Sequence, residues 1–91
     1  MGIRIMDIRF SERFIYEYKK WFYSQPNVVE KIDQLIESIK INPFEGVGKP
    51  ERLKGKINWY SRRITKKDRL IYVVDDSFVT LISCCGHYTD K

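Results

Sequence analysis

The sequence predicts an α+β domain in which an N-terminal strand and a helical hairpin pack on a mostly antiparallel sheet. Helical hydrophobic periodicity runs through the first half of the chain, and strand-like runs rich in β-branched and aromatic residues fill the second half. A loop rich in glycine and proline separates the two halves. With 91 residues there is room for one domain, which we expect to span residues 1–91.

The chain opens with a short expected strand, MDIRF, followed by an expected helix, SERFIYEYKKWFYSQ. Met6 is itself a suitable start, and residues 1–5 would then be an N-terminal extension. Ser11 is a suitable N-cap for the helix. One face of the helix carries an aromatic stripe formed by Phe14, Tyr18, Trp21 and Phe22. We expect this stripe to belong to the core rather than to a ligand site.

The clearest helix is the segment PNVVEKIDQLIESIKINP. Its apolar face consists of Val28, Val29, Ile32, Leu35, Ile36 and Ile39. Pro26 suits the first turn, and Asn27 with Glu30 has the spacing of a capping box. Pro43 ends the helix. Two helices joined by about four residues predict an antiparallel hairpin.

Three strands are expected after the loop PFEGVGKPERLKGK. They are INWYSRRIT, RLIYVV and FVTLISCCGHY, separated by KKD and DDS at hairpin distances. The resulting meander leaves the first strand free to join the sheet as an edge.

The sequence also excludes several classes of protein. No apolar run approaches the roughly 20 residues that a membrane span needs, and the N-terminus lacks the apolar core of a signal peptide. These features predict a cytoplasmic protein without a membrane partner. Cys84 and Cys85 are adjacent, so in a strand they point to opposite faces and remain unbridged. With one histidine and no CxxC, we expect no metal site.

The positive charge is concentrated in one segment. Residues 1–45 carry seven basic and seven acidic side chains, whereas residues 46–91 carry ten and five. Between Lys49 and Arg69 there are nine basic residues, interleaved with Trp59 and Tyr60. A solvated face would explain such a run, but its concentration among aromatic residues favours an anionic polymer such as RNA.

Strand alternation suggests where the arginines lie. A short turn that pairs Arg63 with Arg69 would place both guanidinium groups on one face, and Arg62 on the other. Like charges directly opposite each other are unfavourable, and a fold tolerates them more readily if an anion lies between them. Arginine is also suited to bidentate contact with phosphate oxygens.

His87, the only histidine, lies near the end of the last expected strand. It alternates with Val79, Leu81, Ser83 and Cys85. Pairing of this strand with the one that carries Arg69 would bring His87 near the arginines, unless a bulge reverses the alternation. A lone imidazole also often fills a gap or caps an element, so the residues alone leave a structural role open.

Glu51 is the only acid between Lys49 and Lys67. Its simplest role is a salt bridge to Lys49, Arg52 or Lys54. A carboxylate, an imidazole and a pair of guanidinium groups also form a complete set for cleaving RNA without a metal. One group takes the proton of the 2′-hydroxyl, a second protonates the leaving 5′-oxygen, and cations stabilise the charge at phosphorus.

Four motifs in the second half of the chain occur in the order of a known family. These are PFEGxGKPExLK, WYSRRIT, RLIYVV and the terminal GHY, spread over about half of the chain. Together they resemble the YoeB/Txe family of bacterial toxins, within the RelE/ParE superfamily of type II toxin–antitoxin systems. The resemblance implies a RelE/YoeB-like fold, and the family's usual beginning would fall at Met6.

The resemblance also implies an activity and roles for particular residues. Family members are endoribonucleases that cut mRNA in the ribosomal A site. Glu51 matches the general base, His87 the general acid and Tyr88 a neighbouring tyrosine that helps to orient the substrate. Arg69 matches the arginine that stabilises the transition state. The RNA- and phosphate-binding positions are Lys49, Lys54, Arg62 and Arg63. No metal or organic cofactor is implied.

Two departures from the family pattern stand out. Family members commonly end at the tyrosine, but here Thr89, Asp90 and Lys91 follow, which puts any role of the terminal carboxylate in doubt. The loop between Lys54 and Trp59 is also about one residue short. Neither departure removes a catalytic residue type.

The resemblance implies partners as well. They are the 70S ribosome with its mRNA, and a YefM/Phd-type antitoxin whose disordered acidic tail covers the basic site. Operator DNA would be bound only through the antitoxin. Dimers occur in the family, although no feature of this sequence demands a homodimer.

Three alternatives stay open at this point. A ParE-like toxin that inhibits gyrase shares the fold but should not need the pair Glu51 and His87. A non-catalytic RNA-binding module would use the basic and aromatic residues equally well. Ribosome-independent cleavage is a third alternative, since one chain carries the whole acid–base set.

Overall fold

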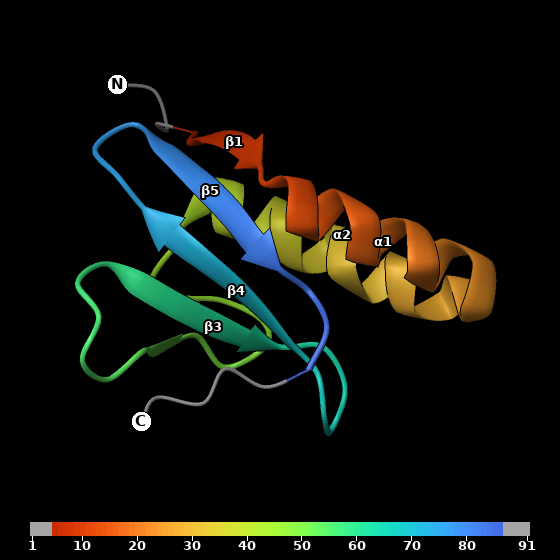
Figure 1. Cartoon of the computed structure of the whole chain (residues 1–91). Helices are drawn as coiled ribbons and strands as arrows, with labels where there is room; N and C mark the ends of the chain where they lie inside the picture. Colours follow the sequence, from red (N-terminus) through yellow and green to blue (C-terminus); the bar gives the residue numbers. More distant parts are fainter. Residues whose placement is uncertain (1–4, 87–91) are drawn as a thin grey trace.

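The computed structural model describes residues 5–86 and confirms the predicted α+β fold. Two helices lie on one face of a five-stranded sheet in this part of the chain (Figure 1). The elements, in order, are β1 (Asp7–Phe10), α1 (Glu12–Ser24), α2 (Pro26–Ile41), β2 (Glu51–Arg52), β3 (Trp59–Arg63), β4 (Arg69–Val74) and β5 (Phe78–Ser83).

The strands are arranged in the order β1-β5-β4-β3-β2. As predicted, β3, β4 and β5 form an antiparallel meander, and β1 joins it as an edge, parallel to β5. The two-residue strand β2 pairs antiparallel with β3 at the other edge, inside the segment that the sequence analysis treated as loop. Glycines and prolines interrupt this segment, so its sequence carries no strand signal.

Helix α1 begins as predicted. The Ser11 hydroxyl oxygen accepts a hydrogen bond from the Phe14 backbone N–H at 3.0 Å, and the hydroxyl donates to the Ile82 carbonyl of β5 at 2.7 Å. One side chain therefore caps the helix and ties it to the sheet. The aromatic stripe lies partly in the core, as expected for Phe14, but Phe22 is 57% exposed.

Helix α2 begins one residue before the predicted capping box. Its N-cap is Gln25, which makes no side-chain capping bond, and Pro26 lies in the first turn as predicted. The expected capping box of Asn27 and Glu30 is wrong, because Asn27 is already inside the helix. The same residue, Gln25, also caps the end of α1, so one residue joins the helices rather than about four.

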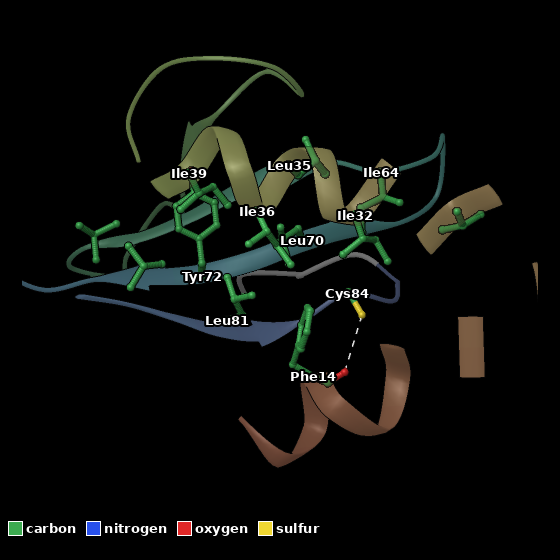
Figure 2. Packing of buried hydrophobic residues seen from close by; sticks show 13 residues of the cluster. Phe14, Ile32, Leu35, Ile36, Ile39, Ile64, Leu70, Tyr72, Leu81 and Cys84 are labelled. Carbon is green, nitrogen blue, oxygen red and sulfur yellow. Dashed lines mark hydrogen bonds between the residues drawn. The ribbon is translucent and has the colours of Figure 1, made fainter. Parts of the chain in front are cut away.

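The core lies between the helices and the sheet (Figure 2). It is formed mainly by Phe14, Ile32, Leu35, Ile39, Leu70, Tyr72, Val79, Leu81 and Cys84. Burying one large apolar side chain contributes about 1.5–3 kcal/mol, so this cluster fixes the hairpin on the sheet. No helix of residues 5–86 is both long enough and apolar enough to cross a bilayer.

Candidate functional site

Arg63 and Arg69 lie directly opposite each other on neighbouring strands. Arg63 ends β3 and pairs in register with Arg69, the first residue of β4, as the sequence analysis predicted. Alternation places both on the sheet face that points away from the helices, because their neighbours Arg62 and Leu70 are buried beneath the helical layer. Two like charges are thus held opposite each other, an arrangement that favours a bound anion.

Glu51 lies on the same face of the sheet. It pairs with Ser61 of β3, two residues before Arg63, so the carboxylate and the Arg63 guanidinium leave neighbouring strands on one side. Glu51 is exposed and makes no ion pair within residues 5–86. The predicted salt bridge to Lys49, Arg52 or Lys54 is therefore wrong.

A basic cleft of about 600 Å³ opens where β3 ends and β4 begins. We call it the hairpin cleft. It is lined by Lys31, Gly48, Lys49, Arg63, Ile64, Thr65, Lys66 and Arg69. Five of these described residues are cationic and none carries a carboxylate, so the local potential attracts anions.

Two of the five cationic residues of the hairpin cleft were missed by the sequence analysis. Lys31 lies on α2, where the helical pattern placed it simply on the polar side, and Lys66 lies in the turn between β3 and β4. Helical periodicity separates buried from exposed positions, but it does not show which loop a polar side chain approaches. Lys66 belongs to the basic run and could have been found by its position in the short turn, three residues before Arg69.

Gly48 sets the position of Lys49 at the rim of the cleft. The Gly48 carbonyl accepts a hydrogen bond from the Arg63 backbone N–H at 2.7 Å. Gly48 has φ +86°, and a Cβ there would lie 2.6 Å from the Leu35 Cδ2 atom and 3.2 Å from the Arg62 Cβ atom. Only glycine allows the loop to approach this closely.

Arg62 is placed away from the hairpin cleft and is fully buried. Its guanidinium donates hydrogen bonds to the Tyr72 hydroxyl, the Ser38 hydroxyl and the carbonyls of Asn42, Glu45 and Val47, at 2.6–3.1 Å. The prediction that Arg62 contacts phosphate is wrong, because this side chain has no exposed surface. It instead holds the loop between α2 and β2 in place.

Tyr72 completes the buried network. Its hydroxyl accepts from Arg62 Nε at 3.0 Å and donates to the Pro43 carbonyl at 2.7 Å. Burial raises the pKa of Tyr72, and the guanidinium of Arg62 opposes that rise. The tyrosine therefore stays a neutral donor that links the sheet to the loop before Glu51.

The Arg69 side chain is anchored to the turn between β3 and β4. Its Nη1 group donates to the carbonyls of Thr65, Lys66 and Asp68 at 3.1, 3.3 and 3.2 Å. These contacts orient the guanidinium without neutralising it, because all three partners are uncharged carbonyl groups. A positioned cation that makes no ion pair with any residue of 5–86 suits stabilisation of developing negative charge.

Lys54 lies in the turn between β2 and β3 and lines a different hollow, of about 470 Å³, together with Arg52 and Lys56. The structure thus does not bring Lys54 into the hairpin cleft with Arg63 and Arg69. Glu51 and Lys54 remain three residues apart, at the sheet edge nearest the cleft.

His87 and Tyr88 lie outside the described residues. The described chain ends at Gly86, whose carbonyl accepts a hydrogen bond from the Arg69 backbone N–H at 3.0 Å. Between Leu81 and Ser83 the predicted alternation is wrong, because the bulge that the sequence analysis left open shifts the register there. Leu81 faces the core opposite Tyr72, whereas Ser83 pairs with Ile71 on the other face.

Cys84 and Cys85 are free, as expected, and differ in environment. Burial raises the pKa of Cys84 to about 12, with a further contribution from the carboxylate of Glu17. Burial and the carboxylate of Asp68 also raise the pKa of Cys85, which remains exposed. Within residues 5–86 no cluster of histidine, cysteine and acidic residues could hold a metal ion.

The fold and the hairpin cleft together define a class of small α+β proteins in which a helical hairpin supports a sheet with a cationic face. Within that class, residues 10–88 match the family model described as the YoeB-like toxin of bacterial type II toxin–antitoxin systems. The chain therefore belongs to the YoeB-like toxins.

Relatives and solved structures agree with this assignment. Toxin YoeB of Escherichia coli strain K12 is 39% identical over 84 residues, which cover 91% of this chain and all of the relative. The YoeB/ParE toxin from Agrobacterium tumefaciens has a TM-score of 0.86 at 38% identity, covering 91% of this chain and all of that one. A YoeB–YefM complex from Staphylococcus aureus has a TM-score of 0.80 at 41% identity, covering 91% of this chain and 98% of the other.

Proposed function

We propose that this toxin is a ribosome-dependent endoribonuclease that cleaves mRNA in the ribosomal A site and so inhibits translation. The observation that carries the proposal is the exposed Glu51 carboxylate, free of any ion pair within residues 5–86, on the same sheet face as Arg63 and Arg69. A surface carboxylate among so many cations would ordinarily be paired with one of them. An unpaired carboxylate is available to accept a proton.

In the proposed reaction, Glu51 takes the proton of a ribose 2′-hydroxyl. The 2′-oxygen then attacks the adjacent phosphorus, the bond to the 5′-oxygen breaks, and His87 gives that oxygen its proton. The products are a 2′,3′-cyclic phosphate and a 5′-hydroxyl end. Histidine suits the acid because its ordinary pKa is about 6.5, and Tyr88 would help to orient the substrate.

The cations of the hairpin cleft would stabilise the extra charge at phosphorus. Arg69, anchored through Nη1, would face the reacting phosphate, and Arg63 and Lys49 would hold oxygens of the backbone. Lys54 would contact RNA from its separate hollow beside Glu51. Side chains alone supply the acid, the base and the charge stabilisation in this proposal.

The partners follow from the same assignment. We propose that the cationic face binds the mRNA within the 70S ribosome and, when inhibited, an acidic YefM/Phd-type antitoxin segment in the cytoplasm. The solved complex of the related Staphylococcus aureus toxin with YefM supports the antitoxin, and a solved dimer of that toxin supports a homodimer. Operator DNA would be contacted through the antitoxin.

The alternatives make different demands on Glu51. A gyrase inhibitor or a plain RNA-binding module would need the cationic residues but no proton acceptor. The exposed carboxylate, which makes no ion pair within residues 5–86, therefore favours the nuclease over both alternatives.

Primer extension on a defined mRNA in a translating bacterial extract tests the proposal. The wild type, Glu51→Gln and His87→Gln are each run with and without ribosomes, and Glu45→Gln, which changes an exposed acid of the preceding loop, is the matched control. We expect cuts in register with codons, present only with ribosomes, reduced to a trace in the first two variants and retained in the control. Intact mRNA during translation with the wild type would overturn the proposal.

A further inference from the structure

The turn between β3 and β4 holds Gly86 at both of its backbone polar groups. The Asp68 Oδ1 atom accepts a hydrogen bond from the Gly86 N–H at 2.8 Å. The neighbouring Arg69 backbone N–H donates to the Gly86 carbonyl at 3.0 Å. Asp68, the last residue of the turn, and Arg69, the first residue of β4, thus fix both peptide groups that flank Gly86, which lies eighteen residues after Asp68.

The Asp68 side chain is itself held rigidly. Its Oδ2 atom accepts from the Thr65 hydroxyl at 2.6 Å, and its backbone N–H donates to that same hydroxyl oxygen at 3.0 Å. The Asp68 carbonyl accepts from the backbone N–H groups of Ile64 and Thr65. The carboxylate that reaches Gly86 therefore has little freedom to move.

The segment between β5 and Gly86 is also held from the helical side. The Trp21 indole N–H donates to the Cys84 carbonyl at 2.8 Å, and the Glu17 carboxylate accepts from the Cys84 N–H at 2.8 Å. No β-ladder continues through Cys84–Gly86, so these side-chain bonds replace it. The chain is therefore positioned by α1 on one side and by Asp68 on the other.

Gly86 is needed for its backbone conformation and not for lack of space. Its φ is +78°, and a Cβ placed there would meet no atom of the described residues within 4 Å, its chain neighbours aside. The left-handed conformation turns the chain sharply at the point where the bonds from Asp68 and Arg69 hold it. The backbone conformation of Gly86 is thus held by this clamp.

We propose that Asp68 is a positioning residue for the general acid His87, acting through the Gly86 clamp. The inference rests on the proposed function. His87 is bonded directly to Gly86, and consecutive Cα atoms are about 3.8 Å apart, so a fixed Gly86 leaves few torsions between the turn and the imidazole. The same turn anchors the Arg69 guanidinium, so the bonds that hold Gly86 and those that orient the cation come from one short segment.

The expected effect is on the chemical step. A displacement of about 1 Å costs on the order of 100-fold in rate, so Asp68→Ala should lower the rate of cleavage on programmed ribosomes by about 10- to 100-fold with the KM unchanged. Asp68→Asn should restore most of the rate, because its amide oxygen can still accept from Gly86 and its NH2 group can bond Thr65. Asp75→Ala, an exposed acid of the turn between β4 and β5, is the matched control.

A double-mutant cycle separates positioning from general damage. In a His87→Gln background, where the acid is already lost, Asp68→Ala should cause no further decrease in rate. An equal decrease in both backgrounds would overturn the inference, as would an unchanged rate for Asp68→Ala alone. Thr65→Ala, which removes one support of the carboxylate, provides a milder variant should Asp68→Ala fail to fold, and we expect a smaller decrease that again vanishes with His87→Gln.

Amide hydrogen exchange tests the clamp without any nuclease assay. The Gly86 N–H should exchange slowly in the wild type and in Asp68→Asn, and much faster in Asp68→Ala, while amides of β4 stay protected. If the clamp is present but the wild type cuts no mRNA, the proposed function fails and the positioning role fails with it. If mRNA is cut but Gly86 exchange is the same in all variants, only the positioning role is overturned.

Discussion

The two faces of the sheet use the same residue types for opposite purposes. Arg62 and Arg63 are adjacent in β3, yet Arg62 is buried under the helices with its guanidinium fully engaged, while Arg63 is exposed at the hairpin cleft. Cys84 and Cys85 show a similar contrast between a buried and an exposed side chain. Residue type alone therefore does not reveal function here, whereas the face on which a residue lies does.

Replacing each arginine in turn gives the largest expected difference between the faces. Arg62→Ala leaves three loop carbonyls and the Tyr72 hydroxyl without their buried donor, so we expect the free energy of unfolding to fall by about 3–5 kcal/mol. Arg63→Ala should change the free energy of unfolding by less than about 1 kcal/mol, but it should lower the cleavage rate by on the order of 100-fold. Urea denaturation and cleavage on programmed ribosomes measure the two effects.

Tyr72→Phe provides the control for the buried face. It removes one hydroxyl from the same network and should cost about 1–3 kcal/mol, with the cleavage rate of the folded protein retained. If Arg62→Ala were as stable as Arg63→Ala, the two faces would not differ as described.

Lys31 and Lys66 test how far the anion-binding surface extends. If both contact RNA phosphates, Lys31→Gln and Lys66→Gln should each weaken binding of single-stranded RNA several-fold, because each removes a cation from the hairpin cleft. The slope of log affinity against log salt should decrease by about 0.7 for each lost contact. Fluorescence anisotropy with a labelled oligonucleotide over a salt series measures both quantities.

Lys40→Gln is the matched control, since Lys40 lies on the same helix as Lys31 but is paired with Glu37 away from the cleft. An equal loss of affinity in Lys40→Gln would indicate a general effect of net charge. An unchanged salt slope in both cleft variants would restrict the site to the arginines and Lys49.

The sequence predicted the part of the site that depends on the regular pairing of β3 with β4, and missed the parts that depend on loops and on the bulge in β5. The pairing of Arg63 with Arg69 follows from a short turn between two clear strands. The burial of Arg62 does not follow from strand alternation. It requires the loop after α2 to fold over the sheet, so that the carbonyls of this loop accept hydrogen bonds from the guanidinium. Strand β2 was missed for the same reason, since two residues carry no periodicity.

The fold itself was predictable because its helices and central strands have strong periodic patterns. The bulge in β5 could not be predicted, because Ile82 fits a strand as well as its neighbours do. The extra residue is visible only in the pairing of β5 with β4. The bulge decides which residues after Leu81 face the helices. Predictions along this strand therefore end at Leu81, even though the strand was correctly placed.

The smallest expected effect concerns the two cysteines and pH. Burial raises the pKa of Cys84 to about 12, so the native protein keeps this proton where the unfolded chain, with an ordinary thiol pKa near 8.5, loses it. The unfolded state then binds fewer protons, and the free energy of unfolding falls as the pH rises from about 8.5 to 9.5, below the range of the tyrosines. Urea denaturation at several pH values in this window measures the slope.

Cys84→Ala should flatten the slope of the unfolding free energy against pH. Cys85→Ala should change this slope less, because the Cys85 thiol is exposed, although its pKa is also raised. Alkylation with iodoacetamide should modify Cys85 first and reach Cys84 only on unfolding, since the thiolate is the reactive species and Cys84 is fully buried. Equal slopes for the two variants together with equal alkylation rates would contradict the separation of these neighbours. The contrast between the faces would then apply to the strands but not to the segment that leads to His87.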